Sequence, residues 1–171
     1  NKHTGEIIWR TESLKDKPTY TSPIAVMYAK QKTIINASPN FIFAVNAENG
    51  EFLWKVPQIV PKDFNSDWEV IKCVTLLFQK GNVYQTVGYN VGAMMLKIAK
   101  NGRKAEVAWT DSILDIHHGG AVLVDGYIYG SNWINNGNGN WCCIEWETGK
   151  KMWEETWNNK GSIISAEGLL Y

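Results

Sequence analysis

The chain has 171 residues, of which 44% are hydrophobic, and its 17 basic and 17 acidic side chains give a pI ≈ 7.0. This balance gives no electrostatic reason to expect nucleic acid or an anionic membrane as a partner. No run of about 18 apolar residues predicts a membrane-spanning helix. Three cysteines are too few and too oddly spaced for a disulfide framework or a zinc site.

Short apolar runs bounded by Gly, Asn and Pro predict an all-β fold. In chain order, we expect a closing strand at residues 6–10 and then repeated units of four strands. The complete units are expected at about residues 20–56, 68–110 and 117–155, and a further unit begins at residues 160–171. Each unit forms hydrophobic faces that need a neighbouring unit to bury them.

Turns and insertions mark the limits of these units. Asn49-Gly50 and Asn101-Gly102 are strong hairpin signals, because both residue types tolerate positive φ. Residues 57–69 are expected to form an insertion between the first two units. Residues 132–140 are expected to form a long polar loop inside the third unit.

Four tryptophans recur along the chain at intervals of 45, 55 and 44 residues. They are Trp9, Trp54, Trp109 and Trp153. In three copies a Gly lies four residues before the Trp, whereas Gly102 lies seven residues before Trp109. A period near 40–45 residues suits the four-stranded blades of a propeller.

The chain begins at Asn1 and ends inside an expected strand, so we expect it to be part of a longer ring. A row of blades with open ends leaves apolar faces exposed. We expect the remainder of the ring, or a second copy of the chain, to cover these faces.

Residues 44–54 resemble the tryptophan-docking repeat of the pyrroloquinoline-quinone-type (PQQ-type) propellers, Ala-x-Asp-x-x-Thr-Gly-x-x-x-Trp. Residues 143–153 resemble a second copy. The resemblance implies a β-propeller of seven or eight blades, about four of them present here. It also implies that each Trp stacks on the peptide at the Gly of the neighbouring motif. The residues assigned to this docking are Gly5, Trp9, Ala44, Gly50, Trp54, Trp109, Cys143, Gly149 and Trp153.

Members of this family differ in function. Some are quinone-dependent alcohol dehydrogenases, including enzymes that act on polyvinyl alcohol, and others are cofactor-free scaffolds of the outer-membrane barrel assembly machinery. The docking motif is common to all members, so it does not choose among these functions. Because no set of catalytic residues is found, we expect a non-catalytic scaffold that binds an unknown protein or glycan without a cofactor. The resemblance implies a place in the periplasm or at the outer membrane. The alternative is a dehydrogenase that binds PQQ with calcium.

Cys142-Cys143 is the one feature that resembles the enzymes, in which an adjacent-cysteine disulfide packs on the quinone. In the enzymes the pair precedes the first strand of a blade, whereas here Cys143 occupies the Ala position of the docking motif on a third strand. Neighbouring Cα atoms in a strand are also too close for an ordinary disulfide. We therefore expect two small buried residues and no catalytic residue.

Asp115, His117 and His118 are candidate ligand-binding residues, because they lie at the start of a first strand and first strands line the channel of a propeller. Adjacent strand residues point to opposite faces, so no metal site is expected from the two histidines. A structural role is also open, with Gly119-Gly120 allowing close packing of the blades.

Asn132, Trp133 and Trp141 belong to an asparagine-rich segment that could hold a sugar, which makes a polysaccharide-binding module a second alternative. Asp63, Asp67 and Glu69 lack the ligand spacing of a calcium loop, so we expect a solvated acidic stretch there.

Overall fold

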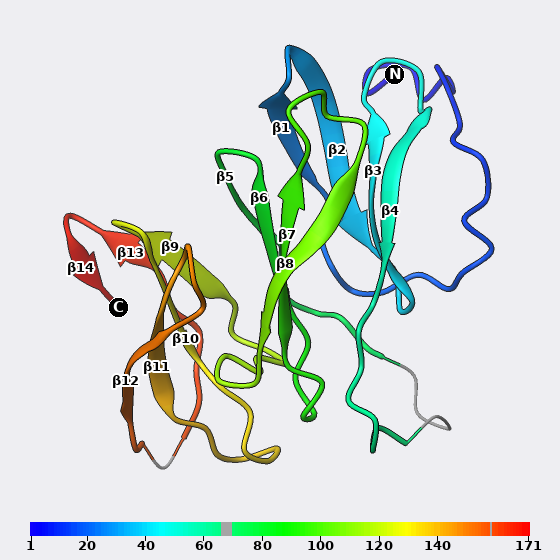
Figure 1. Cartoon of the computed structure of the whole chain (residues 1–171). Helices are drawn as coiled ribbons and strands as arrows, with labels where there is room; N and C mark the ends of the chain where they lie inside the picture. The colour runs from blue at the N-terminus through cyan, green and yellow to red at the C-terminus, as the bar shows by residue number, and fades with distance from the viewer. Residues whose placement is uncertain (66–69, 158) are drawn as a thin grey trace.

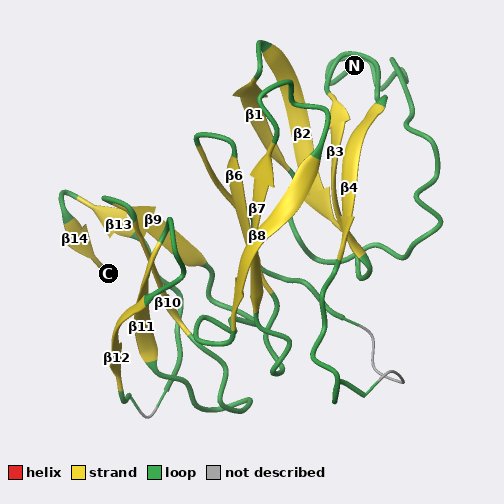
Figure 2. Ribbon diagram, viewed as in Figure 1, coloured by secondary structure: helices red, strands yellow, loops and turns green. Residues whose placement is uncertain are grey.

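The structure is a computed structural model that describes residues 1–65, 70–157 and 159–171 (Figure 1). Strands and loops, without any helix, make up these residues (Figure 2), and this confirms the all-β prediction. Within the described part of the chain, no helix is therefore available to cross a membrane. Asp63 is exposed, and the predictions for Asp67 and Glu69 lie outside the described residues.

The first sheet contains four antiparallel strands in chain order: β1 (Ile24–Tyr28), β2 (Gln31–Ala37), β3 (Phe41–Asn46) and β4 (Phe52–Pro57). The strands are rich in β-branched and aromatic residues, which favour extended backbone. A two-residue turn at Ala29-Lys30, with both residues at positive φ, joins β1 to β2. This conformation is the one that matches the twist of a tight hairpin.

The second sheet repeats this order with β5 (Leu77–Gln79), β6 (Asn82–Thr86), β7 (Ala93–Ile98) and β8 (Ala105–Asp111). In both sheets the register shifts once between the third and fourth strands, which is a bulge at the same place in the repeat. The second unit is therefore a structural copy of the first, as its sequence pattern predicts.

The third sheet contains β9 (Ala121–Val124), β10 (Tyr127–Ser131), β11 (Trp141–Glu145) and β12 (Lys151–Glu155). The three sheets follow one another as separate blades (Figure 1), and no described strand joins one sheet to the next. This is the arrangement of propeller blades, here as a row that does not close into a ring.

The two ends of the chain differ from a complete blade. At the C-terminal end, β13 (Ser165–Ala166) and β14 (Leu169–Leu170) form a two-stranded sheet. At the N-terminal end, residues 6–10, where a closing strand is expected, form no ladder with the described residues. A strand needs a neighbour to supply backbone hydrogen bonds, and among the described residues none pairs with this segment.

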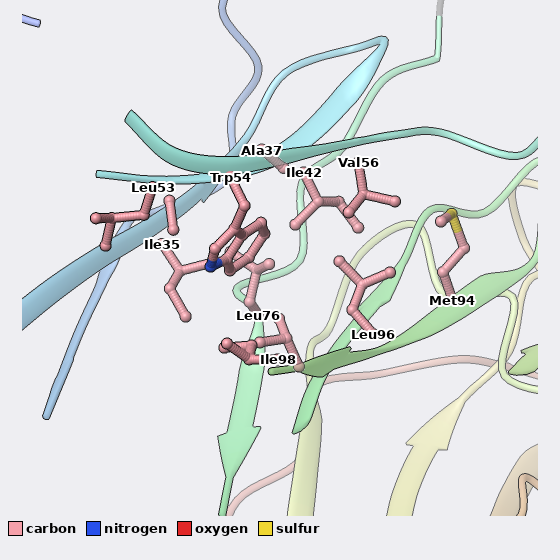
Figure 3. Packing of buried hydrophobic residues seen from close by; sticks show 12 residues of the cluster. Ile35, Ala37, Ile42, Leu53, Trp54, Val56, Leu76, Met94, Leu96 and Ile98 are labelled. Carbon is pink, nitrogen blue, oxygen red and sulfur yellow. The ribbon is translucent and has the colours of Figure 1, made fainter. Parts of the chain in front are cut away.

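Apolar side chains between successive sheets form the core. Trp54 of β4 points toward the second sheet (Figure 3) and belongs to one buried cluster with Leu76, Leu96 and Ile98. A second cluster lies between the second and third sheets and includes Tyr84 and Ile128. Burial of such side chains contributes roughly 1.5–3 kcal/mol each, so the contacts between blades supply much of the stability.

Two tryptophans lie against the glycine of the following motif. A Cβ added to Gly50 would come within 2.5 Å of the Trp9 ring, and one added to Gly149 within 2.8 Å of the Trp109 ring. The indole Nε1 of Trp9 donates to the Ala47 carbonyl at 3.0 Å. The indole of Trp109 donates in the same way to Glu147 at 3.1 Å. Both glycines have positive φ, so only glycine fits this contact without strain.

Trp54 has a different neighbour. Only Ala29 and Tyr28 approach a Cβ placed on Gly102, so the Trp54 ring does not stack on that residue. Tyr28 lies instead against Gly81, and its hydroxyl donates to the Ile98 carbonyl at 3.3 Å. The three extra residues between Gly102 and Trp109 displace the turn from the position that Trp54 would reach.

The remaining assigned docking residues lie at the matching places of the repeat. Ala44 is fully buried opposite Trp54, and Cys143 is buried opposite Trp153. Trp153 is 44% exposed on the last complete blade. A Cβ placed on Gly5 meets no other residue.

Candidate functional site

Cys73 and His117 lie side by side where the first strands of two neighbouring blades begin. Each is four positions before the first residue of its strand, Leu77 of β5 and Ala121 of β9. Cys73 Sγ lies 4.0 Å from His117 Nε2. The repeat therefore brings these two side chains together across the boundary between the second and third blades.

The two adjacent histidines do not point to opposite faces, so the reasoning that separated them is wrong. Their ring centroids are 4.0 Å apart. Gly119 and Gly120 both adopt positive φ, at 96° and 75°, so the extended chain of β9 begins only at Ala121. His117 and His118 lie in the bend before the strand, where the alternation of side chains along a strand does not apply.

Asp115 holds a neighbouring loop in place. Its carboxylate accepts backbone hydrogen bonds from Gly88 at 3.0 Å, Asn90 at 2.6 Å and Gly92 at 2.6 Å. Burial raises the pKa of this carboxyl although the three hydrogen bonds oppose the shift. Asp115 therefore fixes the loop between β6 and β7 and has little capacity left to contact a ligand.

Replacing Asp115 with Asn is expected to lower the free energy of unfolding by about 2 kcal/mol, because the amide has one acceptor oxygen for three backbone donors, two of them buried. Denaturant unfolding would measure this loss. Asp125→Asn, in the exposed turn between β9 and β10, is the matched control and should change stability by less than about 0.5 kcal/mol. Equal losses in the two variants would contradict the assigned role.

Aromatic rings complete the cluster at this end of the blades. The ring centroid of Tyr89 lies 4.3 Å from that of His117 and 4.9 Å from that of Trp133. The ammonium of Lys160 lies 6.0 Å from the Trp133 ring centroid. We refer to Cys73, Tyr89, His117, His118 and Trp133 as the channel-end cluster. It presents imidazole, thiol and aromatic groups, a combination that suits a metal or a partner side chain.

Hydrogen bonds between its own residues hold the asparagine-rich loop in its conformation. The Asn132 side chain accepts a hydrogen bond from the Asn140 backbone at 2.7 Å. Trp133 contacts Tyr89, whereas Trp141 lines a pocket of about 230 Å³ with Trp153 and Tyr171. The two tryptophans thus have different neighbours, and within the described part of the chain they do not form one aromatic surface for a sugar.

Cys142 and Cys143 are both buried free thiols. Cys142 belongs to the core between the second and third blades, while Cys143 is opposite Tyr129 and Trp153. Burial raises the pKa of Cys142 to about 12. Because adjacent residues of β11 point to opposite faces, a disulfide between them would require this strand to be distorted.

Sequence reasoning missed Cys73, Tyr89 and Lys160 as members or neighbours of the site. The available signal was the repeat itself, since Cys73 and His117 precede their first strands by the same number of residues. Tyr89 gave no such signal. Its φ of 58° places it in a left-handed turn, a conformation that its residue type does not favour.

The fold matches that of a known protein, and the sequence matches a family model. The crystal structure of BamB from Moraxella catarrhalis matches with a TM-score of 0.62 and 13% identity, over 91% of this chain and 44% of that one. The chain thus spans less than half of that protein. No curated protein matches the sequence. A family model described as "Outer membrane protein assembly factor BamB" matches residues 1–155. The chain belongs to this BamB-like family of PQQ-type repeat β-propellers.

Proposed function

We propose that the chain is part of a non-catalytic propeller scaffold that binds a protein partner in the periplasm or at the outer membrane. The family match over residues 1–155 carries this proposal, because the matching model is described as an outer membrane protein assembly factor. The similar fold of BamB supports it. The proposal needs no cofactor.

The hydrogen bonding of the carboxylates of Asp111 and Asp115 supports a scaffold rather than an enzyme. Asp111 accepts a hydrogen bond from the Tyr84 hydroxyl at 3.0 Å and from the backbone of Ile113 and Leu114 at 2.8 Å. Asp115 accepts three backbone hydrogen bonds. A general base needs a free lone pair within reach of a substrate proton, and each of these carboxylates uses three of its roughly four acceptor positions to hold a loop.

The positions of the cysteines argue against the dehydrogenase alternative. A quinone-stacking disulfide at Cys142-Cys143 would have to form across opposite faces of β11. Both thiols lie in packed surroundings, one of them in the core between blades. The pair therefore has a packing role, which is the role that a small residue has at this place in the repeat.

Site-specific photo-crosslinking in cells would test the scaffold role. Ile134, at 50% exposure in the loop between β10 and β11, can carry the photoreactive side chain at the same end as the channel-end cluster. Asp125, in the turn at the other end of the third blade, is the second position. We expect a discrete protein adduct from Ile134 and a weaker one from Asp125. The absence of any protein adduct from both positions would contradict the proposal.

A further inference from the structure

We propose that Cys73, His117 and His118 form a binding site for a divalent transition metal of the zinc class. Each residue offers one ligand atom, and these atoms all lie within 4.8 Å of one another. The inference rests on the arrangement and surroundings of these three side chains and is independent of the proposed scaffold function. It replaces the expectation, drawn from strand alternation, that the histidines could not share a metal.

The separation of the donor atoms fits tetrahedral coordination. Zinc binds sulfur at about 2.3 Å and imidazole nitrogen at about 2.0–2.1 Å. In a tetrahedral site these bond lengths place the sulfur and nitrogen atoms about 3.5 Å apart. Cys73 Sγ and His117 Nε2 are 4.0 Å apart, so a small rotation of either side chain brings the two atoms to the separation that a shared zinc ion requires.

His117 is already oriented for metal binding. Its Nδ1 lies 3.4 Å from the Val87 carbonyl oxygen, and a proton on Nδ1 leaves the lone pair of Nε2 directed at Cys73. Carbonyl partners of this kind fix the tautomer and the ring orientation of metal-binding histidines. A Cβ on Gly88 would collide with the backbone and Cβ of His117. The loop therefore packs closely on His117 and restricts its movement.

The donor set selects the type of metal. One thiolate with two imidazoles suits Zn²⁺ and chemically similar ions, whereas Ca²⁺ and Mg²⁺ prefer oxygen ligands. Burial lowers the pKa of His117, with His118 contributing in the same direction, and this favours the neutral imidazole that a metal requires. His118 is exposed, so solvent reaches the site and a water molecule can complete the coordination.

Isothermal titration of the metal-free protein with Zn²⁺ tests the site. We expect one equivalent of Zn²⁺ to bind to the wild type. In Cys73→Ser and His118→Ala we expect the affinity for Zn²⁺ to fall on the order of 100-fold, because removing a ligand should cost at least as much as removing an outer-shell partner. His3→Ala removes the one other histidine of the chain, an exposed residue near the N-terminus, and should bind as the wild type does. Circular dichroism would verify that each variant is folded.

Substitution with Co²⁺ identifies the sulfur ligand directly. We expect a thiolate-to-cobalt charge-transfer band in the wild type and in His3→Ala, and its loss in Cys73→Ser. If Cys73→Ser fails to fold, the exposed His118→Ala still decides the question by titration. No stoichiometric zinc binding to the wild type, or wild-type affinity in folded His118→Ala, would overturn the proposal.

Discussion

Replacing Trp54 with Ala is expected to lower the free energy of unfolding by about 3–5 kcal/mol. The side chain is 7% exposed and lies between the first and second blades (Figure 3). Its removal would leave a cavity among Leu76, Leu96 and Ile98 that side chains from two separate sheets cannot easily fill. Chemical denaturation followed by far-ultraviolet circular dichroism would measure the effect.

Two further variants separate packing from other effects of the substitution. Lys55→Ala, at the exposed neighbouring position of β4, should cost less than about 1 kcal/mol. Trp54→Phe should lower the free energy of unfolding less than Trp54→Ala does, because Phe keeps most of the apolar contacts. No hydrogen bond is lost in Trp54→Phe, since the buried Nε1 of Trp54 has no hydrogen-bond partner among the described residues. A Trp54→Ala variant that unfolded at the wild-type denaturant midpoint would contradict the interblade role.

The stability of the protein is expected to rise between pH 7 and pH 8.5 because of Lys72. This lysine is fully buried, and its ammonium donates to the carbonyl oxygens of Ser38 at 2.7 Å and Phe41 at 3.3 Å. Burial lowers the pKa of Lys72 from 10.5 to about 7, against the opposing attraction of Asp16. Over the pH range between these two values, such a pKa shift changes the free energy of unfolding by about 5 kcal/mol.

The sign follows from proton binding. Above pH 7 the unfolded chain keeps the Lys72 proton that the folded protein has released, so raising the pH favours the folded state. Between pH 7 and pH 8.5 the gain is roughly 1.5 kcal/mol. Cysteine thiols begin to ionise in the unfolded chain within the same range, which offsets part of this gain. The contribution of Lys72 is therefore the difference between the profiles of the wild type and a Lys72 variant.

Denaturation at several pH values, with a chelator present, would measure this slope. Lys72→Met should give a flatter profile between pH 7 and pH 8.5. Lys100→Met, at an exposed position, should keep the wild-type slope. Parallel profiles for the wild type and Lys72→Met would show that Lys72 does not titrate in this range.

The repeat made the fold predictable, because each Gly-to-Trp segment marks the hairpin between the third and fourth strands of a blade. Trp9 and Trp109 lie against Gly50 and Gly149, where the four-residue spacing is kept. The exception at Gly102 is also visible in the sequence as a longer gap. The contact of Tyr28 with Gly81 was not predicted, because both residues lie at the first hairpins of successive blades, outside the Gly-to-Trp segment.

The candidate site was predictable only in part. Asp115, His117 and His118 stood out as polar residues before a first strand, but the alternation rule assigned the histidines to opposite faces. Two consecutive glycines with positive φ delay the start of β9 and remove that alternation. Cys73 is 44 residues from His117, and only the stacking of whole blades brings the two together.

The measurement that tests the scaffold account most directly is a titration of the protein with pyrroloquinoline quinone and calcium, followed by tryptophan fluorescence. A cofactor-free scaffold predicts no saturable quenching while circular dichroism shows the protein to be folded. Saturable quenching at one equivalent of quinone would contradict the account and identify a quinone-dependent enzyme.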